Sequence, residues 1–252
     1  MSGLWEQLPA PAGFLGMHVA HGSGAQPAGT AVICHGFPLE RESAQRTGRT
    51  FPALADRLAA ESGWEVIAGC LRGVGPSEGN FSLAGWLEDL GAFVDCAAGR
   101  AGGAAGVRVV GFGTSGSLAL CLAATDERIR GVACLGSAAT FADWAQDLHG
   151  MLDFARRVGI VEDPDFPPDL ETWGAAFGSL RPDEAAAGVA PRPMLIVHGT
   201  EDEGVPVSDA RTLADAGGPS AELRLLAGAG HRLRADPRAI ALLVGWLERQ
   251  GP

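Results

Sequence analysis

The strongest constraint on the fold is an alternation of short apolar runs with segments of helical periodicity. Five runs look like buried strands, and a sixth at 221–228 alternates polar with apolar residues and suits a sheet edge. Strands that alternate with helices form crossover units, so we predict an α/β fold with a mostly parallel open sheet and helices on both faces. The five runs lie at 30–36, 64–70, 107–113, 129–136 and 193–199, and helices are expected around 51–59, 83–93, 118–122 and 240–247.

The segment from about 138 to 190 breaks this alternation, because it contains no strand-like run. Residues 141–159 are predicted to form one amphipathic helix, 162–173 a proline-rich turn and 181–189 a further short helix. We therefore predict a single domain over 1–252 with a small helical insertion at about 138–190, which acts as a lid over one end of the sheet. An extended pair of crossover helices is the alternative.

Composition limits the classes of partner. The net charge is −11 and no basic cluster stands out, so no nucleic acid is expected as a partner. No apolar run approaches the roughly 18 residues that a membrane span needs, and the opening residues do not read as a signal peptide, so a cytoplasmic location is expected. The five cysteines form no CxxC pair and the glycines lack the dinucleotide spacing, so no metal and no cofactor are expected.

Unusual residues follow the strands, where an open parallel sheet gathers its functional groups. The loop "HGFPLE" turns at Gly36 and leaves the Phe37 N–H free to face a pocket. Arg72, in "RGVGPSEG", is expected to hold neighbouring carbonyls or carboxylates. The stretch "GFGTSG" reads as a strand, a sharp turn and a helix. Asp202 lies in "HGTEDEGVP", and His231 ends "GAGH".

These five motifs, in this order, resemble the α/β-hydrolase family, and the likeness covers the chain from about Thr30 onward. The nearest resemblance is to small bacterial serine esterases, lipases and acyl-peptide hydrolases. That family carries its nucleophile in a G-x-S-x-G elbow. The resemblance implies that Asp202 is the acid, that His231 is the base, and that the N–H groups of Phe37 and Thr114 form the oxyanion hole. It puts the nucleophile position on Gly113.

A glycine cannot act as a nucleophile, so the elbow departs from the family pattern. Thr114 could take its place only if the turn slid by one residue. Ser115 would take it if residues 113–117, "GTSGS", formed the elbow, but the apolar run has its last β-branched residue at Val110. Gly113 would still preserve the turn, because glycine adopts positive φ without strain.

Three functions remain open. The first is hydrolase-like chemistry on a small ester, acyl or carbonyl substrate by an Asp202–His231 dyad with a backbone oxyanion hole. The second is a non-catalytic protein that binds a small acyl or carboxylate ligand or a partner protein. The third is a serine hydrolase that uses Ser115 through a shifted elbow. An apolar pocket under the lid is expected to involve Trp144, Leu148 and Met151, which could instead pack the lid on the core.

Overall fold

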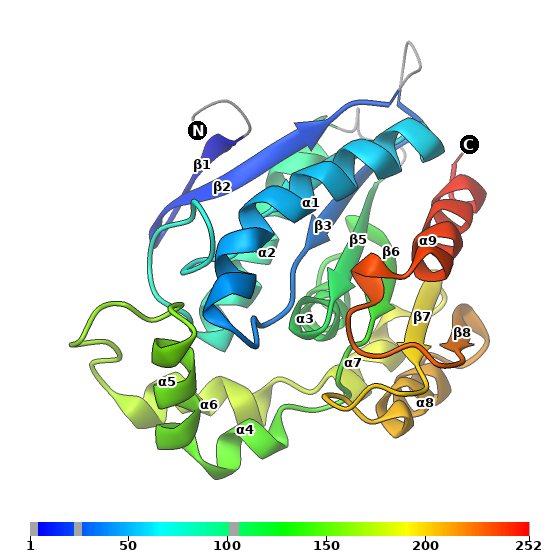
Figure 1. Cartoon of the computed structure of the whole chain (residues 1–252). Helices are drawn as coiled ribbons and strands as arrows, with labels where there is room; N and C mark the ends of the chain where they lie inside the picture. Colours follow the sequence, from blue (N-terminus) through cyan, green and yellow to red (C-terminus); the bar gives the residue numbers. More distant parts are fainter. Residues whose placement is uncertain (1–4, 23–26, 101–105, 252) are drawn as a thin grey trace.

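A central eight-stranded sheet organises the computed structural model, which describes residues 5–22, 27–100 and 106–251 (Figure 1). The spatial order is β1-β2-β4-β3-β5-β6-β7-β8, and all strands from β4 to β8 in this order run parallel. The six predicted strands are confirmed, with β8 at the sheet edge. Their bounds are β3 (Thr30–Cys34), β4 (Glu65–Gly69), β5 (Val107–Phe112), β6 (Ile129–Leu135), β7 (Met194–Gly199) and β8 (Ala221–Leu226).

Helices cover both faces of the sheet, as predicted. On one face lie α1 (Arg41–Ser62) and α9 (Pro237–Arg249), and on the other lie α2 (Leu83–Arg100), α3 (Thr114–Ala123) and α8 (Val207–Gly217) (Figure 1). Each face has its own hydrophobic core, and alternate residues of β3 point into the two cores. Among the residues described, no helix has both the length and the apolar character needed to cross a bilayer.

The first two strands were not predicted. β1 (Glu6–Ala10) and β2 (Gly13–Ala20) pair antiparallel with each other, and β2 pairs antiparallel with β4. Most residues of β1 are exposed, so this edge strand lacks the apolar run that marks a buried strand. The sequence pattern therefore revealed only the inner part of the sheet and one of its two edges.

Four helices separate β6 from β7: α4 (Ala142–Gln146), α5 (Leu148–Arg157), α6 (Leu170–Ser179) and α7 (Pro182–Val189). The prediction of one helix over 141–159 is wrong, because the chain breaks at Asp147. The Asp147 carboxylate accepts a hydrogen bond from the Gly150 N–H at 2.8 Å and caps α5. The last residues of the proline-rich turn predicted at 162–173 are also helical, because α6 begins at Leu170. In Figure 1, α4, α5 and α6 lie beyond the carboxyl ends of the parallel strands.

Candidate active site

Gly113 is the central residue of the sharp turn between β5 and α3. Its φ of 56° and ψ of −125° lie in a region that glycine adopts without strain. The Gly113 N–H donates to the Leu135 carbonyl at 2.8 Å, which ties the turn to the end of β6. A Cβ on Gly111 would collide with the backbone of Gly116. The glycines of "GFGTSG" therefore allow both the sharp turn and the close approach of helix to strand.

His231 and Asp202 form a hydrogen-bonded pair beside this turn. The His231 Nδ1 lies 2.9 Å from the Asp202 Oδ2, and the Asp202 side chain is fully buried. The other carboxylate oxygen accepts hydrogen bonds from the N–H groups of Gly204 and Val205, both at 2.9 Å. Burial opposes ionisation of Asp202, but the hydrogen bonds and the nearby imidazole outweigh it and hold the pKa of Asp202 below its usual value.

A second histidine supports the same carboxylate and was not singled out in the sequence. The His198 Nε2–H donates to the Val205 carbonyl at 2.9 Å and also lies 3.4 Å from the Asp202 Oδ2. Its side chain is fully buried. The motif "HGTEDEGVP" contains this residue, but only the folded loop shows that its first histidine packs on its own aspartate.

The His231 ring faces the empty side of the elbow. A Cβ built on Gly113 would lie 3.6 Å from the His231 Nε2 and 3.5 Å from the Gly36 Cα, which are ordinary van der Waals distances. The space for a side chain therefore exists at Gly113, directly in front of the ring nitrogen that does not contact Asp202.

Phe37 and Thr114, whose amides were expected to form an oxyanion hole, lie on either side of Gly113. A cavity of about 260 Å³ is lined by both residues together with Gly113 and His231. Within the described part of the chain, neither the Phe37 N–H nor the Thr114 N–H donates a hydrogen bond to the backbone or to a side chain. Both donors are thus available at the elbow.

Ser115 points away from the histidine. It is fully buried, and its hydroxyl donates to the Cys34 carbonyl at 2.7 Å and accepts from the Phe112 N–H at 3.0 Å. These contacts join the elbow to β3. Helix α3 begins at Thr114, and the positive φ falls on Gly113. The structure therefore gives no support to an elbow centred on Ser115.

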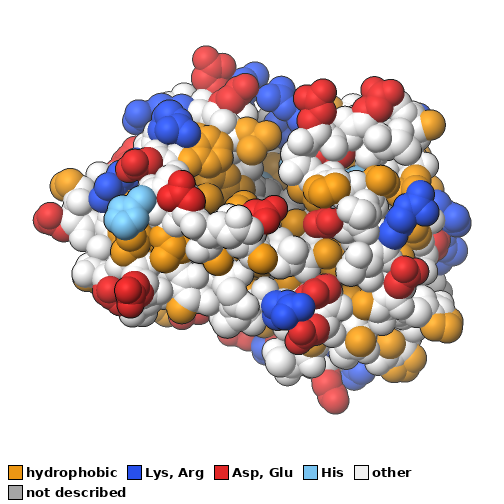
Figure 2. Space-filling model, turned by 90° about the horizontal axis from the view of Figure 1, so that it is seen from below, with side chains coloured by type: hydrophobic (Ala, Val, Ile, Leu, Met, Phe, Trp, Pro, Cys, Tyr) orange, Lys and Arg blue, Asp and Glu red, His pale blue; other side chains and the backbone are white. Residues whose placement is uncertain are grey.

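The 260 Å³ cavity extends beneath α4 and α5. Two of the residues expected in an apolar pocket, Trp144 and Met151, line it together with Phe154. Leu148 does not line the cavity and instead lies against Gly174 of α6, which corresponds to the packing alternative. Seen from the side of these helices, the surface has a hollow bordered by hydrophobic side chains (Figure 2).

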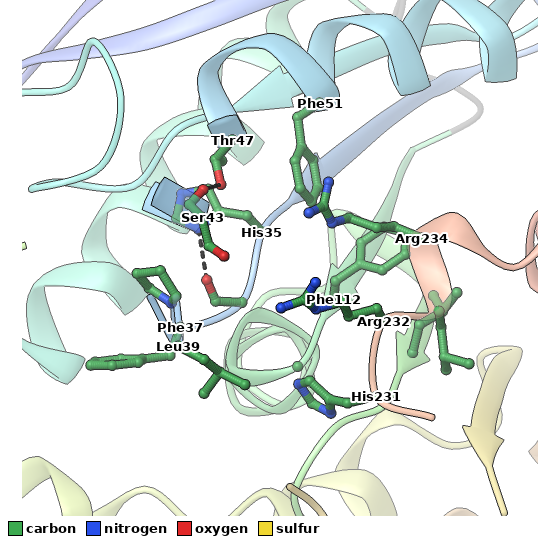
Figure 3. A pocket seen from close by; sticks show the side chains of 15 residues that line it. His35, Phe37, Leu39, Ser43, Thr47, Phe51, Phe112, His231, Arg232 and Arg234 are labelled. Atoms are coloured by element: carbon green, nitrogen blue, oxygen red, sulfur yellow. Dashed lines mark hydrogen bonds between the residues drawn. The ribbon is translucent and has the colours of Figure 1, made fainter. Parts of the chain in front are cut away.

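A smaller cavity of about 90 Å³ adjoins the same centre and shares Phe37, Leu39, Gly113 and His231 with the first (Figure 3). His35 lies in its wall. The Nδ1 of His35 donates to the Gly36 carbonyl at 2.9 Å, and its Nε2 accepts from the Leu71 N–H at 3.0 Å. Burial lowers the pKa of His35 to about 4, so the ring is neutral at pH 7.

Within residues 5–22, 27–100 and 106–251, no group of three or more His, Cys, Asp or Glu side chains is arranged to hold a metal ion.

Comparison with known proteins agrees with the fold described above. A sequence model described as "alpha/beta hydrolase fold" matches residues 31–173. No curated protein is similar enough in sequence to count as a relative.

Solved structures resemble the whole chain. The structure of Est1E from Butyrivibrio proteoclasticus has a TM-score of 0.71 at 19% identity, over 98% of this chain and 97% of that one. GrgF, an alpha/beta hydrolase from Penicillium sp. sh18, has a TM-score of 0.74 at 16% identity, over 98% of both chains. CumD, a meta-cleavage product hydrolase from Pseudomonas fluorescens IP01, has a TM-score of 0.67 at 21% identity, over 97% of both chains. At such identities the likeness establishes the fold.

Proposed function

Because the chain belongs to the α/β-hydrolase family, we propose that it performs hydrolase-like chemistry on a small ester, acyl or carbonyl substrate without an acyl-enzyme. The Asp202–His231 pair acts as the acid–base group, and the Phe37 and Thr114 amides stabilise the developing oxyanion. The observation that carries this proposal is the position of the His231 Nε2, 3.6 Å from where a Gly113 side chain would begin. The volume that a nucleophilic side chain would occupy is left for a water molecule or a substrate atom.

The hydrogen bond to Asp202 determines what His231 can do. With Nδ1–H donating to the carboxylate, Nε2 carries a lone pair and can accept a proton. In the proposed reaction, a water molecule transfers a proton to Nε2 while its oxygen bonds to the substrate carbonyl carbon. The carbonyl electron pair moves onto the oxygen, which the two amides hold. Collapse of this intermediate expels the leaving group, which takes the proton from His231.

The expected rates suit an activated substrate. General-base catalysis contributes about 10²–10⁴-fold. A preorganised oxyanion donor contributes about 10²–10³-fold. These contributions are sufficient for an activated ester or a reactive carbonyl compound and too small for an amide.

The helices α4 and α5 have a place in this proposal as a lid. They contribute Trp144 and Met151 to the wall of the 260 Å³ cavity, next to His231. A substrate whose apolar part lay under these helices would be shielded from water other than the attacking molecule. Such exclusion strengthens the electrostatic interactions at the reacting carbon.

A non-catalytic function is the second candidate, and one observation favours it. No side chain hydroxyl or thiol occupies the elbow position, so the acyl transfer typical of the family has no nucleophile there. The two unpaired amides could hold the carboxylate of a bound ligand without any reaction.

Activity and labelling measurements on four proteins distinguish these functions. The wild-type chain is assayed on a panel of activated esters, and we expect turnover that His231→Ala lowers by about 10²–10⁴-fold. Gly113→Ser should raise ester hydrolysis by at least about a hundredfold and become labelled by a fluorophosphonate at residue 113, because the base and the oxyanion donors are already in position. Ser115→Ala is the matched control: it removes two buried hydrogen bonds and lowers stability, but the turnover of the folded protein should fall far less than in His231→Ala.

Each outcome bears on one function. Fluorophosphonate labelling of the wild-type protein at Ser115 would contradict the proposal and restore the shifted elbow. No turnover by the wild-type chain on the whole panel would favour the binding function. If Gly113→Ser keeps the native circular dichroism spectrum and stays inert, the arrangement of elbow and dyad argued above is wrong.

A further inference from the structure

Arg234 is a cation in the wall of the cleft beside His231. It belongs to the short 3-10 helix η2 (Leu233–Ala235), which follows His231 directly, and it is partly buried. Among the residues that the structure describes, no side chain or carbonyl forms a hydrogen bond or an ion pair with its guanidinium. Figure 3 shows the Arg234 side chain reaching into the 90 Å³ cavity on the side of Phe51.

The surroundings of Arg234 disfavour its charge. Burial lowers the pKa of Arg234, and the positive charges of Arg232 and Arg46 lower it further. The carboxylates at this rim are already engaged, because Glu42 pairs with Arg46 at 3.2 Å and Glu40 lies 3.7 Å from Arg232. Within the described fold no counter-charge offsets that of Arg234, so an anion bound beside the partly buried guanidinium would gain a favourable electrostatic interaction.

The remaining walls suit a small anion. Ser43 and Thr47, from the first two turns of α1, line the cavity opposite the arginines, and the Thr47 hydroxyl already donates to the Ser43 carbonyl at 2.9 Å, which leaves the Ser43 hydroxyl as the polar group of this wall. His35 is neutral and already bonded through both ring nitrogens, so it adds no competing charge. The planar guanidinium offers paired N–H donors that match the two oxygens of a carboxylate.

The two cavities differ in charge. The 90 Å³ cavity has Arg232 and Arg234 in its wall, whereas the 260 Å³ cavity is lined mainly by apolar residues, with Asp143 and Asp209 as its acidic members. An anionic group is therefore repelled from the larger cavity and attracted to the smaller one. Because both cavities open on Gly113 and His231, a molecule reacting there can extend into each of them.

We propose that the cavity beside Arg234 binds a carboxylate of the substrate. This inference rests on the proposed function and names its substrate class. The substrate is a small ester or carbonyl compound with a carboxylate on one side of the reacting carbon and an apolar group on the other. The carboxylate is held by Arg234, with Arg232 adding to the positive potential at the mouth, and the apolar group lies under α4 and α5.

Equilibrium binding tests this inference without requiring turnover. The affinities of 3-phenylpropionate and of its uncharged analogue 3-phenylpropionamide for the full chain are measured by calorimetry or NMR titration. We expect the wild-type protein to prefer the carboxylate by at least about tenfold, because a hydrogen bond to a charged partner contributes more than a neutral one. Arg234→Gln should remove most of this preference, and Arg234→Lys should retain part of it.

Arg249→Gln is the matched control. It removes the same charge from the C-terminal segment, at an exposed residue paired with Glu222, and should leave the preference unchanged. Equal affinity of the wild-type protein for carboxylate and amide would overturn the inference. So would a preference that survives in Arg234→Gln, since the carboxylate would then bind elsewhere, for example at the two elbow amides.

Failure of this inference is distinguishable from failure of the proposed function. A carboxylate preference that depends on Arg234, in a protein that turns over no ester, would support the anion site and contradict the catalytic proposal. Turnover that depends on His231, with no carboxylate preference, would support the catalytic proposal and contradict the anion site.

Discussion

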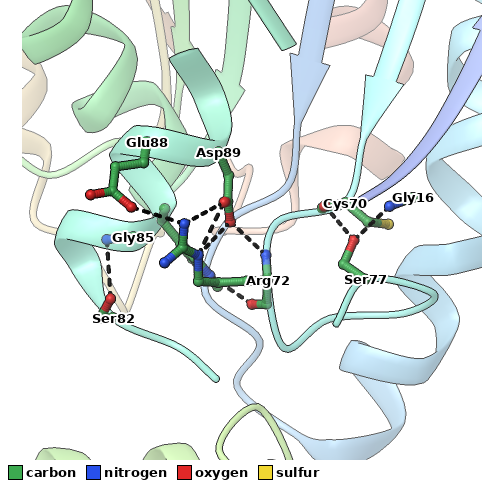
Figure 4. Close-up of polar contacts among 9 residues, drawn as sticks. Gly16, Cys70, Arg72, Ser77, Ser82, Gly85, Glu88 and Asp89 are labelled. Atoms are coloured by element: carbon green, nitrogen blue, oxygen red, sulfur yellow. Dashed lines mark hydrogen bonds and ion pairs between the residues drawn. The ribbon is translucent and has the colours of Figure 1, made fainter. Parts of the chain in front are cut away.

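Arg72 is buried and Arg234 is partly buried, and the two guanidinium groups differ in their partners. The Arg72 guanidinium is held by Asp89, with contacts as short as 2.7 Å, and by Glu88 at 3.0 Å (Figure 4). The backbone N–H of Arg72 also donates to the fully buried Asp89 carboxylate at 2.8 Å. Arg234 has no such partners among the residues described.

The pKa values of the two arginines express this difference. Burial by itself would lower the pKa of Arg72, but the hydrogen bonds and the charge of Asp89 raise it above its usual value. Burial and neighbouring arginines lower the pKa of Arg234. The comparison teaches that a buried cation with carboxylate partners holds a loop in place, as predicted for Arg72, whereas a partly buried cation without them in the described structure leaves its charge open to a ligand, as proposed above for Arg234.

The largest effect is expected where the satisfied pair is broken. Asp89→Ala leaves the Arg72 guanidinium buried without its main partner and should lower the free energy of unfolding by about 3–5 kcal/mol. Urea denaturation measures this change. Glu88→Ala is the control, because its carboxylate is 60% exposed and its loss should cost less than about 1 kcal/mol. Equal losses in the two variants would show that the buried network does not stabilise the loop.

The second largest effect on stability is expected from His35. This residue lines the cavity beside Arg234 and bonds to Gly36 and to Leu71, the residue before Arg72. Its pKa of about 4 in the folded chain lies below the value of 6.5 expected on unfolding, chiefly because of burial. The unfolded chain therefore binds more protons between these pH values. Stability should be complete above pH 6.5 and should fall by about 3 kcal/mol as the pH decreases to 4.

Urea unfolding measured from pH 4 to 7.5 checks this expectation. His35→Gln should flatten the pH dependence over that window. Asp202 does not interfere, since its folded pKa is depressed and its contribution is lost only below its ordinary value of 3.8. An unchanged slope in His35→Gln would mean that another group titrates there.

The smallest effect is expected at the unsatisfied arginine. Arg234→Met replaces the guanidinium by an apolar side chain of similar length, so the free energy of unfolding should stay the same or rise by up to about 1 kcal/mol. The same urea measurement compares it with wild type. A loss of more than about 2 kcal/mol would reveal a structural role for Arg234 and weaken the contrast with Arg72.

Local patterns in the sequence were sufficient for much of the fold and part of the site. Buried parallel strands give apolar runs, and helices give their own period, so β3 to β8 and four main helices were predicted. The motif order placed Gly113 at the elbow and paired Asp202 with His231, and the structure brings these three together. Three features were not predicted, because the apolar pattern of the sequence does not mark them: the solvated strand β1, the helix α8 and the break between α4 and α5 at Asp147.

The sequence by itself determined the order of the inner strands and main helices along the chain and the glycine at position 113 of the elbow motif, because backbone preference and apolar periodicity act between near neighbours. Only the tertiary structure decided that the Ser115 hydroxyl bonds to Cys34 and that His198 lies against Asp202. It also decided that Arg234 lines a cavity in which no described residue supplies a counter-charge. These features depend on burial and on contacts between distant segments. The hydrogen bonds and the desolvation of these side chains are fixed only once those segments have packed.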